Sequence, residues 1–309
     1  MLTRSQDPES TIVQISPEPH DSNGMSLMQL AMRRLRRDRL TLIAIGFLLT
    51  LALLAFAAPL IEQALGVSYT RTDVTNAFQP VNSPGHLLGT DDLGRDHLAR
   101  LLYAGQVSLL WIAIPAALLS LGIGVLLGVM TGYYGGVVDD IVNWIITTLN
   151  SIPSLFLLLI VSAVLSPGPT TLVLVLGLLG WTGTTRLVRG ETLSIREREF
   201  IISAKALGAS PWRIMFHHIV PNLMSIVVIT LAIDIGTLIL VESALSFLGL
   251  GVKPPIPTWG NMLTNAQTFF TKGVHLVIIP GMLITTTVLC LYVIGDGIRD
   301  AFDPTAVDK

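Results

Sequence analysis

Long stretches without a charged residue dominate the chain from residue 40 onward. Four of them cover residues 40–61, 101–138, 141–185 and 273–295, and a fifth at 222–247 has only Asp234 and Glu242 as charged residues. About 20 apolar residues cross the hydrocarbon core of a bilayer. Proline interrupts a helix, so Ser166-Pro167-Gly168-Pro169 divides the longest stretch. The pattern therefore predicts an all-α, polytopic membrane protein with six transmembrane helices.

Basic residues are unevenly distributed around these stretches. Five arginines lie within residues 33–39, and six lysines and arginines lie within residues 186–213. The remaining loops either have few basic residues (249–272) or offset them with aspartates (62–100). Since loops rich in Lys and Arg stay on the cytoplasmic side, both basic segments and both termini are predicted to be cytoplasmic. This orientation requires an even number of spans, in agreement with the apolar pattern.

The composition supports a bilayer environment and excludes several other classes of protein. Hydrophobic residues make up 51% of the chain and charged residues 13%, against about a quarter charged residues in soluble domains. The net charge of −2 provides no nucleic-acid-binding surface. The chain has no Gly-Lys pair, and therefore no phosphate-binding loop, and its single cysteine excludes a multi-cysteine metal site. We therefore predict no catalytic residue, no metal ligand and no cofactor bound by this chain.

Two cytoplasmic segments have helical patterns of their own. In residues 25–39, methionines and a leucine recur at helical spacing among arginines, which is typical of a helix on an anionic membrane surface. The alternative is a basic flank of the first span. In residues 186–222, a run of helix formers at 191–207 ends at Gly208, and Ser210-Pro211 then begins a second short helix. Such a structured loop indicates a partner; a solvated connector is the alternative.

Glycines recur at every fourth position at residues 124, 128 and 132. This spacing puts them on one face of a helix, where a second helix backbone can approach closely. The glycine stripe predicts helix packing and says little about function.

The structured loop resembles the coupling loop of ABC-importer permeases. The matching residues are 199–210 (EFIISAKALGAS) and 218–222 (HIVPN). The family pattern is Glu-Ala-Ala, three residues, Gly, nine residues and Ile-x-Leu-Pro, and Gly208 and Pro221 stand at that spacing. Residues 202–204 (Ile-Ser-Ala) occupy the Glu-Ala-Ala positions. The family glutamate is thus missing, and Glu199 is the carboxylate one turn earlier.

Three further segments are similar to the dipeptide, oligopeptide and nickel branch of that family. They are residues 86–96 (HLLGTDDLGRD), 246–251 with 257–260 (SFLGLG and PTWG) and 295–304 (GDGIRDAFDP). The resemblance covers roughly residues 30 to 304. It implies the "C" permease of a peptide-uptake system, with a type I ABC-importer permease fold, in the bacterial cytoplasmic (inner) membrane.

The resemblance also implies partners and a coupling element. A second homologous permease would complete the pathway, and two cytoplasmic ATPase subunits would use ATP and magnesium. An extracytoplasmic substrate-binding protein would deliver the substrate, membrane lipid would surround the helices, and no nucleic acid would be involved. The structured loop would act as a lever between the ATPases and the membrane helices. Its implied coupling residues are Glu199, Ser203, Ala204, Gly208, Ala209 and Pro221.

The spans and motifs together predict a division of the chain. Residues 1–39 form a cytoplasmic tail with a basic amphipathic helix, residues 40–61 the first transmembrane helix and residues 62–104 an external loop. Residues 105–297 form the permease core, with the coupling loop at 190–221, and residues 298–309 a cytoplasmic tail.

Asp234 and Glu242 have two interpretations. They are eight residues apart and lie broadly on one helix face. Carboxylates at membrane depth face a cavity or a partner. Either the two residues line the pathway and meet a cationic or zwitterionic substrate, or they bond neighbouring helices or the other permease.

The external loops also have two interpretations. In the functional one, they contact the binding protein through Asp91, Asp92, Arg95, Asp96 and Trp259. In the structural one, Thr90 and Asp91 cap a short helix that runs to Arg100, and Arg95 pairs with a nearby carboxylate.

Other functions remain as alternatives. Within the family, nickel chelates and oligosaccharides are alternatives to di- and oligopeptides as substrates. Outside it, an ion-driven secondary transporter tends to show inverted repeats and interrupted helices with ion ligands. A membrane enzyme would present a nucleophile–base pair or a metal constellation. The sequence shows no clear repeat and no such constellation.

Overall fold

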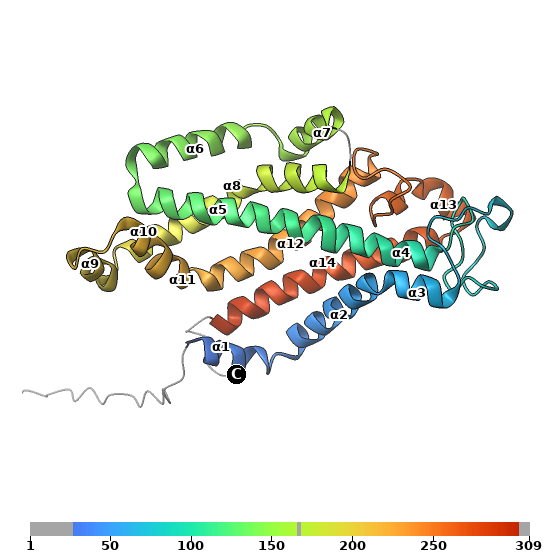
Figure 1. Ribbon diagram of the computed structural model, residues 1–309, viewed down its shortest axis with the longest axis horizontal. Coiled ribbons are helices and arrows are strands. Elements are labelled where there is room, and N and C mark those ends of the chain that lie inside the picture. The colour runs from blue at the N-terminus through green and yellow to red at the C-terminus, as the bar shows by residue number, and fades with distance from the viewer. Residues whose placement is uncertain (1–26, 166–167, 303–309) are drawn as a thin grey trace, which may run out of the picture.

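The computed structural model describes residues 27–165 and 168–302, which form helices and no strand. The long helices run side by side in an elongated bundle, and short helices and loops gather towards its two ends (Figure 1). Predictions that concern residues 1–26, Ser166-Pro167 and residues 303–309 lie outside the described residues.

Within the described residues, five helices are long and apolar enough to cross a membrane. They are α2 (Arg39–Phe56), a continuous helix made of α4 (His97–Gly105), the π-helical η2 (Gln106–Ala113) and α5 (Ile114–Tyr134), then α8 (Pro169–Arg196), α12 (Met224–Phe247) and α14 (His275–Phe302). The continuous helix has 38 residues. At 1.5 Å per residue it is about 57 Å long, against about 30 Å of hydrocarbon, so several of its turns project beyond a membrane.

The predicted third span is divided into two helices. They are α6 (Gly136–Asn150) and α7 (Ser154–Val164), separated around Pro153, which has no backbone N–H for a helix hydrogen bond. Together α6 and α7 run back along the bundle over α5 and α8 (Figure 1). Neither is long enough alone to count as a spanning helix, so the number of six spans stays a prediction.

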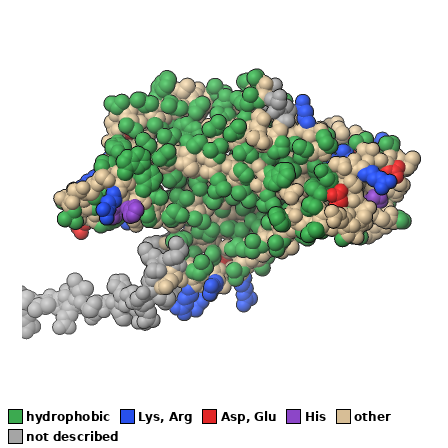
Figure 2. Space-filling view, in the orientation of Figure 1, with side chains coloured by type: hydrophobic (Ala, Val, Ile, Leu, Met, Phe, Trp, Pro, Cys, Tyr) green, Lys and Arg blue, Asp and Glu red, His purple; other side chains and the backbone are tan. Residues whose placement is uncertain are grey.

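Shorter elements lie at the ends of the bundle. One group comprises α1 (Leu27–Leu35), α9 (Glu199–Ala206), α10 (Pro211–Arg213), the π-helical η3 (Ile214–Ile219) and α11 (Val220–Asn222). The other comprises α3 (Ala58–Leu65), η1 (Val74–Asn76), η4 (Asn261–Leu263) and α13 (Ala266–Lys272). The α9–α11 segment, α1 and the end of α14 lie towards one end, with α3 and α13 at the other (Figure 1). Apolar side chains cover the middle of the visible face (Figure 2).

The glycine stripe is the contact line between α5 and α8. A Cβ atom added at Gly124, Gly128 or Gly132 would lie 2.6, 2.7 or 2.6 Å from the Cβ atom of Thr184, Val188 or Thr192, respectively. The prediction that the stripe packs a helix is therefore confirmed, and the packed helix is α8. This close pair leads from the middle of the bundle directly to α9, because α8 ends at Arg196.

Candidate functional site

The segment that resembles a coupling loop begins where α8 ends. Nη1 of Arg196 donates hydrogen bonds to the carbonyl oxygens of Gly132 and Tyr133, at 3.0 and 3.3 Å, and so fixes the end of α8 against α5. The chain turns at residues 197–198 and α9 follows at once. The run of helix formers at 191–207 is thus divided between the end of α8 and α9.

Gly208 makes the turn between the two short helices. Its φ angle is +82°, in the left-handed region that favours glycine, and its N–H donates to the carbonyl oxygen of Lys205 at 3.0 Å. An added Cβ atom would meet nothing within 4 Å, so the outer side of the turn is open. Next, the side chain of Ser210 accepts a hydrogen bond from the N–H of Arg213 at 3.4 Å, and Pro211 begins α10. The predicted order of helix, glycine turn and helix is confirmed.

One face of this segment is anchored in the bundle. The buried residues Ile201, Ile214, Met215 and Ile219 pack in one cluster with residues of α5 and α8, and with Leu223 at the start of α12. The segment is therefore held by the helices that precede and follow it, as a rigid lever requires.

The opposite face of the segment is exposed and partly apolar. The side chain of Leu207 is 89% exposed and that of Trp212 is 57% exposed; the Trp212 ring stacks on Phe216 at 5.1 Å between centroids. Of the implied coupling residues, four are exposed and two are half-buried. The exposed ones are Glu199, Ser203, Gly208 and Pro221, and the half-buried ones are Ala204 and Ala209.

The two membrane-depth carboxylates have different surroundings. Glu242 is fully buried, and its carboxylate accepts hydrogen bonds from the hydroxyls of Ser108, at 3.1 Å, and Ser246, at 2.7 Å. Asp234 is only half-buried and accepts one hydrogen bond, from the hydroxyl of Thr184 at 3.3 Å. Glu242 thus ties α12 to the continuous helix within this chain, as the helix-bonding interpretation describes, whereas Asp234 keeps a free face towards its surroundings.

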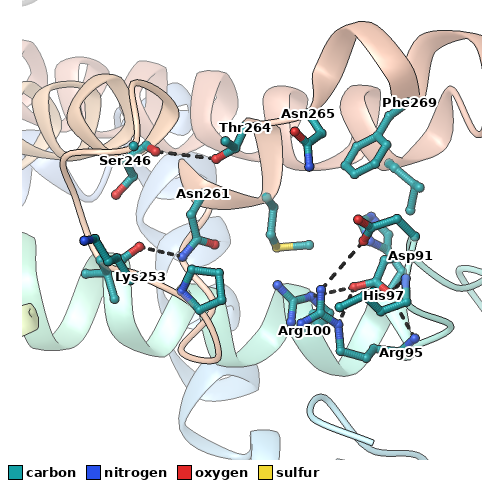
Figure 3. A pocket seen from close by; sticks show the side chains of 17 residues that line it. Asp91, Arg95, His97, Arg100, Ser246, Lys253, Asn261, Thr264, Asn265 and Phe269 are labelled. Atoms are coloured by element: carbon teal, nitrogen blue, oxygen red, sulfur yellow. Dashed lines mark hydrogen bonds and ion pairs between the residues drawn. The ribbon is translucent and has the colours of Figure 1, made fainter. Parts of the chain in front are cut away.

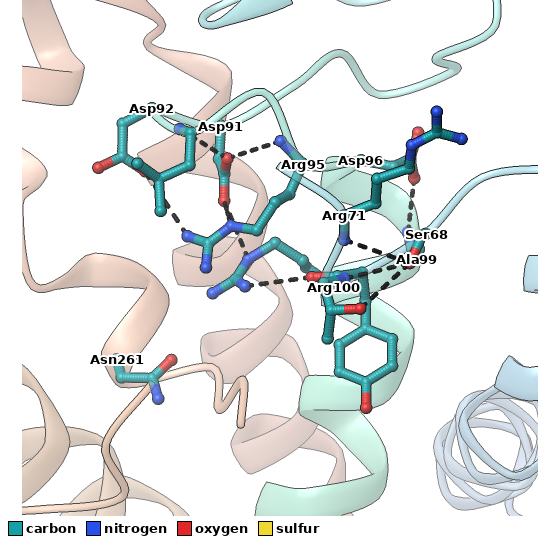
Figure 4. A network of polar contacts seen from close by, with 12 residues as sticks. Ser68, Arg71, Asp91, Asp92, Arg95, Asp96, Ala99, Arg100 and Asn261 are labelled. Atoms are coloured by element: carbon teal, nitrogen blue, oxygen red, sulfur yellow. Dashed lines mark hydrogen bonds and ion pairs between the residues drawn. The ribbon is translucent and has the colours of Figure 1, made fainter. Parts of the chain in front are cut away.

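Asp91 and two arginines form a buried network at the other end of the bundle (Figure 4). Oδ2 of Asp91 lies 2.7 Å from Nε of Arg95 and 3.1 Å from Nε of Arg100. Oδ1 of Asp91 accepts the backbone N–H groups of Leu93 and Arg95. Asp92 is a weaker partner, with 3.7 Å between its Oδ1 and Nη2 of Arg95. The expected pairing of Arg95 with a carboxylate is confirmed.

Asp96 caps α4. Its Oδ1 accepts the N–H of Ala99 at 2.7 Å, and its Oδ2 lies 2.8 Å from Nδ1 of His86. The prediction that Thr90 and Asp91 cap this helix is therefore wrong, because Asp91 is already committed to the two arginines.

The remaining external candidate, Trp259, is fully buried. Its indole N–H donates to the carbonyl oxygen of Leu101 at 3.3 Å, and its backbone N–H donates to the hydroxyl of Ser108 at 3.1 Å. Among the five external candidates, Asp92 alone is more than marginally exposed. Contact of these residues with a binding protein stays a prediction.

The turn at residues 73–76 packs against the loop that carries the Asp91 network. The N–H of Asp73 donates to the carbonyl oxygen of Leu93, and a Cβ atom added at Gly94, where φ is +72°, would lie 1.7 Å from the carbonyl oxygen of Asp73. Hydrogen bonds from Thr75 and Asn76 lower the pKa of the Asp73 carboxyl below its usual value, so this turn keeps its negative charge near neutral pH.

An ion pair between α6 and α8 was not foreseen from the sequence. Nε and Nη2 of Arg189 each lie 2.5 Å from one carboxylate oxygen of Asp139, and this pair of hydrogen bonds lowers the pKa of Asp139. The two residues are 50 positions apart. The only indication in the sequence is that Asp139 lies between two apolar stretches, at 101–138 and 141–185.

Within the described residues, no group of three His, Cys, Asp or Glu side chains is placed to hold a metal ion. The anchored helix–glycine–helix segment and the long apolar helices instead define a multi-pass membrane protein of the transport permease class.

The chain belongs to the family of inner membrane components of binding-protein-dependent transport systems, whose family model matches residues 124–307. A second family model, for the N-terminal transmembrane domain of oligopeptide transport permease C, matches residues 26–80. Both the resemblance seen in the sequence and the inner-membrane location are thereby confirmed.

Individual relatives are similar over nearly the whole chain. The dipeptide transport system permease protein of Alkalihalophilus pseudofirmus is 35% identical, over 98% of this chain and 99% of its own length. The oligopeptide transport system permease protein of Bacillus subtilis is 34% identical, over 93% of this chain and 92% of its own. The glutathione transport system permease protein of Pectobacterium atrosepticum is 36% identical, over 88% and 89%.

Proposed function

We propose that this chain is the transmembrane permease subunit of an ATP-driven importer of di- or oligopeptides. The main support for an ATP-driven mechanism is the geometry of the segment 199–221. This segment is anchored in the bundle on one face and exposes apolar side chains on the other. The names of the dipeptide and oligopeptide relatives support the substrate class.

The geometry supports a lever mechanism. The segment follows α8 after a two-residue turn and continues into α12 through Leu223, so a force on its exposed face acts on both helices. These same helices are bonded to each other where Thr184 of α8 meets Asp234 of α12. Movement of the lever would change the position of Asp234, which is our candidate for a pathway residue that meets the amino group of a peptide.

The proposal assigns the remaining tasks to other subunits. Two cytoplasmic ATPases bind ATP and magnesium, since this sequence lacks a phosphate-binding loop. A second permease completes the pathway, and a binding protein delivers the peptide from outside. Each of these subunits is a predicted partner.

The experiment is purification of the tagged chain from native membranes in mild detergent, with identification of the proteins that accompany it. Three versions are compared: the wild type, Gly208→Trp and Gly208→Asn. Asparagine tolerates the left-handed conformation, so Gly208→Asn keeps the turn and serves as the matched control. We expect ATPases and a second permease with the wild type and Gly208→Asn, and loss of the ATPases with Gly208→Trp.

The wild-type complex is then tested for ATP-dependent uptake of a labelled dipeptide in proteoliposomes that also contain the binding protein. Two results would contradict the proposed function. One is a chain that purifies without any ATPase, and the other is uptake that does not depend on ATP and is driven by an ion gradient.

A further inference from the structure

A cavity of about 280 Å³ lies beside the Asp91 network. Its walls come from two segments far apart in the sequence, residues 91–100 and residues 246–276 (Figure 3). Both segments belong to the end of the bundle that the distribution of basic residues predicts to be outside. The long helix that begins at His97 exceeds the membrane thickness, so its first turns, which line the cavity, are able to stand in the aqueous region.

Positive charge is in excess around the cavity. Three cationic side chains line it, from Arg95, Arg100 and Lys253, against two carboxylates, from Asp91 and Asp92. Both arginines use Nε to bind Asp91, which fixes the planes of their guanidinium groups. Lys253 is exposed, and no ion pair involves it within the described part of the chain. The cavity therefore offers fixed donors and one uncommitted positive charge.

A buried polar side chain without a partner also faces the cavity. His97 lines it and is 1% exposed, and neither of its ring nitrogens has a hydrogen-bond partner within the described residues. Its ring stands edge-on to that of His275, with 5.9 Å between centroids. Buried polar atoms in folded proteins are nearly always satisfied, so the side chain indicates a polar occupant.

The size and the remaining wall restrict that occupant. The volume is near the lower end of about 300–1,000 Å³ that is usual for small-molecule pockets. The buried apolar side chains of Met262, Phe269 and Leu276 also line the cavity. The cavity thus suits a small group that has a negative end and an apolar body, and it is too small for a whole oligopeptide.

We propose that this cavity is a carboxylate-binding site that receives the C-terminal end of a peptide at the outer face of the permease. The guanidinium groups of Arg95 and Arg100 bind the carboxylate, because charge-assisted bonds from arginine are among the strongest available to it. Lys253 adds positive charge from the side of the cavity where Asn261 lies (Figure 3). The apolar wall contacts the last side chain of the peptide. The inference rests on the proposed function, because it takes a peptide as the cargo.

The test measures binding of Ala-Ala, and of Ala-Ala with an amidated C-terminus, to the permease complex purified without its binding protein and without ATP. Saturation-transfer NMR or calorimetry gives the affinities. We expect the amide to bind at least about 10-fold more weakly, because it lacks the charge. Lys253→Gln should weaken Ala-Ala binding about 5-fold, as for a partly exposed charge. Asn265→Phe, at an exposed position of the cavity wall, should block it.

Lys272→Gln is the matched control. It removes the same charge from the same external segment, but Lys272 does not line the cavity and lies over the Phe78 ring. It should leave Ala-Ala binding unchanged. Equal binding of the two peptides, or binding that neither Lys253→Gln nor Asn265→Phe alters, overturns the proposal. So does a result in which these variants weaken only the docking of the binding protein.

Failure of this inference is distinguishable from failure of the proposed function. ATP-dependent dipeptide uptake together with no carboxylate-dependent binding overturns the cavity assignment and leaves the importer intact. Carboxylate-dependent binding without any ATP-dependent uptake overturns the importer and leaves the cavity assignment intact.

Discussion

The two ends of the bundle differ in whether their side chains find partners within the chain. At the predicted outer end, Asp91, Arg95 and Arg100 are each less than 10% exposed and are paired within the chain. At the predicted cytoplasmic end, the segment 199–221 leaves Leu207 and Trp212 largely exposed. Apolar side chains along the middle of the bundle meet lipid, but those on a projecting segment do not.

The difference indicates which end of the bundle needs another subunit to cover its side chains. At the predicted outer end, the carboxylate of Asp91 and the two arginines already pair with one another and need no partner subunit for that. A projecting segment with an exposed apolar face is typical of a protein–protein contact. The coupling segment is therefore where we expect another subunit to bind most tightly.

Loss of the Asp91 carboxylate tests the outer end and should have the largest effect. Asp91→Asn leaves two buried arginines without their anion, which destabilises a protein by about 3–5 kcal/mol. Thermal unfolding in detergent should show a strongly lowered midpoint and a low yield. Asp92→Asn is the matched control, because Asp92 lies 3.7 Å from Arg95 and is partly exposed. An equal loss of stability in both variants would contradict the assigned network.

A charge at Leu207 tests the cytoplasmic end. Leu207→Glu should leave the unfolding midpoint almost unchanged, since the side chain is 89% exposed. It should weaken ATPase binding about 30-fold or more, as the loss of a central apolar contact does. Co-purification and ATPase titration measure the effect. Phe270→Glu, at an exposed apolar position of the other end, is the control. If Phe270→Glu also released the ATPases, the segment would not be the specific docking site.

The α5–α8 contact connects the two ends and has its own test. Gly128→Ala places a Cβ atom 2.7 Å from that of Val188, and overpacking of this kind costs about 1–3 kcal/mol. Gly122→Ala is made on the same helix, where an added Cβ atom meets nothing within 4 Å. Thermal unfolding should show a lower midpoint for Gly128→Ala only. Equal midpoints would mean that α5 and α8 separate easily and do not transmit force.

Local patterns carried most of what the sequence predicted correctly. The glycine stripe, the Gly208 turn and the Ser210-Pro211 helix start depend on a few neighbouring residues, and each was found where its pattern lies. The break at Pro153 was missed because the apolar stretch continues on both sides of it, so the hydropathy pattern shows no interruption there. An uninterrupted hydropathy run therefore does not guarantee one continuous helix.

Contacts between distant residues were the part that the sequence did not provide. Asp96, not Thr90 or Asp91, caps α4, because Asp91 has two arginine partners that only the fold identifies. Likewise Ser108 meets Glu242 across 134 positions, and the cavity walls come from segments about 150 residues apart. Such pairings follow from helix packing, which a single sequence does not specify.

Loss of the Asp139–Arg189 pair should have the smallest effect. It refines the comparison, because this ion pair lies towards the predicted cytoplasmic end of α8. Its side chains are 17% and 32% exposed, so solvent screening limits its contribution to less than about 1 kcal/mol. Hydrogen bonds from Arg189 hold the pKa of Asp139 below its ordinary value of 3.8. The stabilisation is thus fully present above that value and is lost as the pH falls through the lower, folded-state pKa.

Arg189→Gln removes the partner and should remove this pH dependence. At pH 7 the variant should unfold slightly below the wild type in detergent, and the difference should shrink as the pH falls below 3.8. A difference that stays constant from pH 7 to pH 3 would mean that Arg189 acts through packing alone. The expected result is a difference in unfolding midpoint that shrinks at low pH and is much smaller than the loss caused by Asp91→Asn. It would show that ion pairs contribute little to stability at the predicted cytoplasmic end, where the main stabilising contacts are apolar.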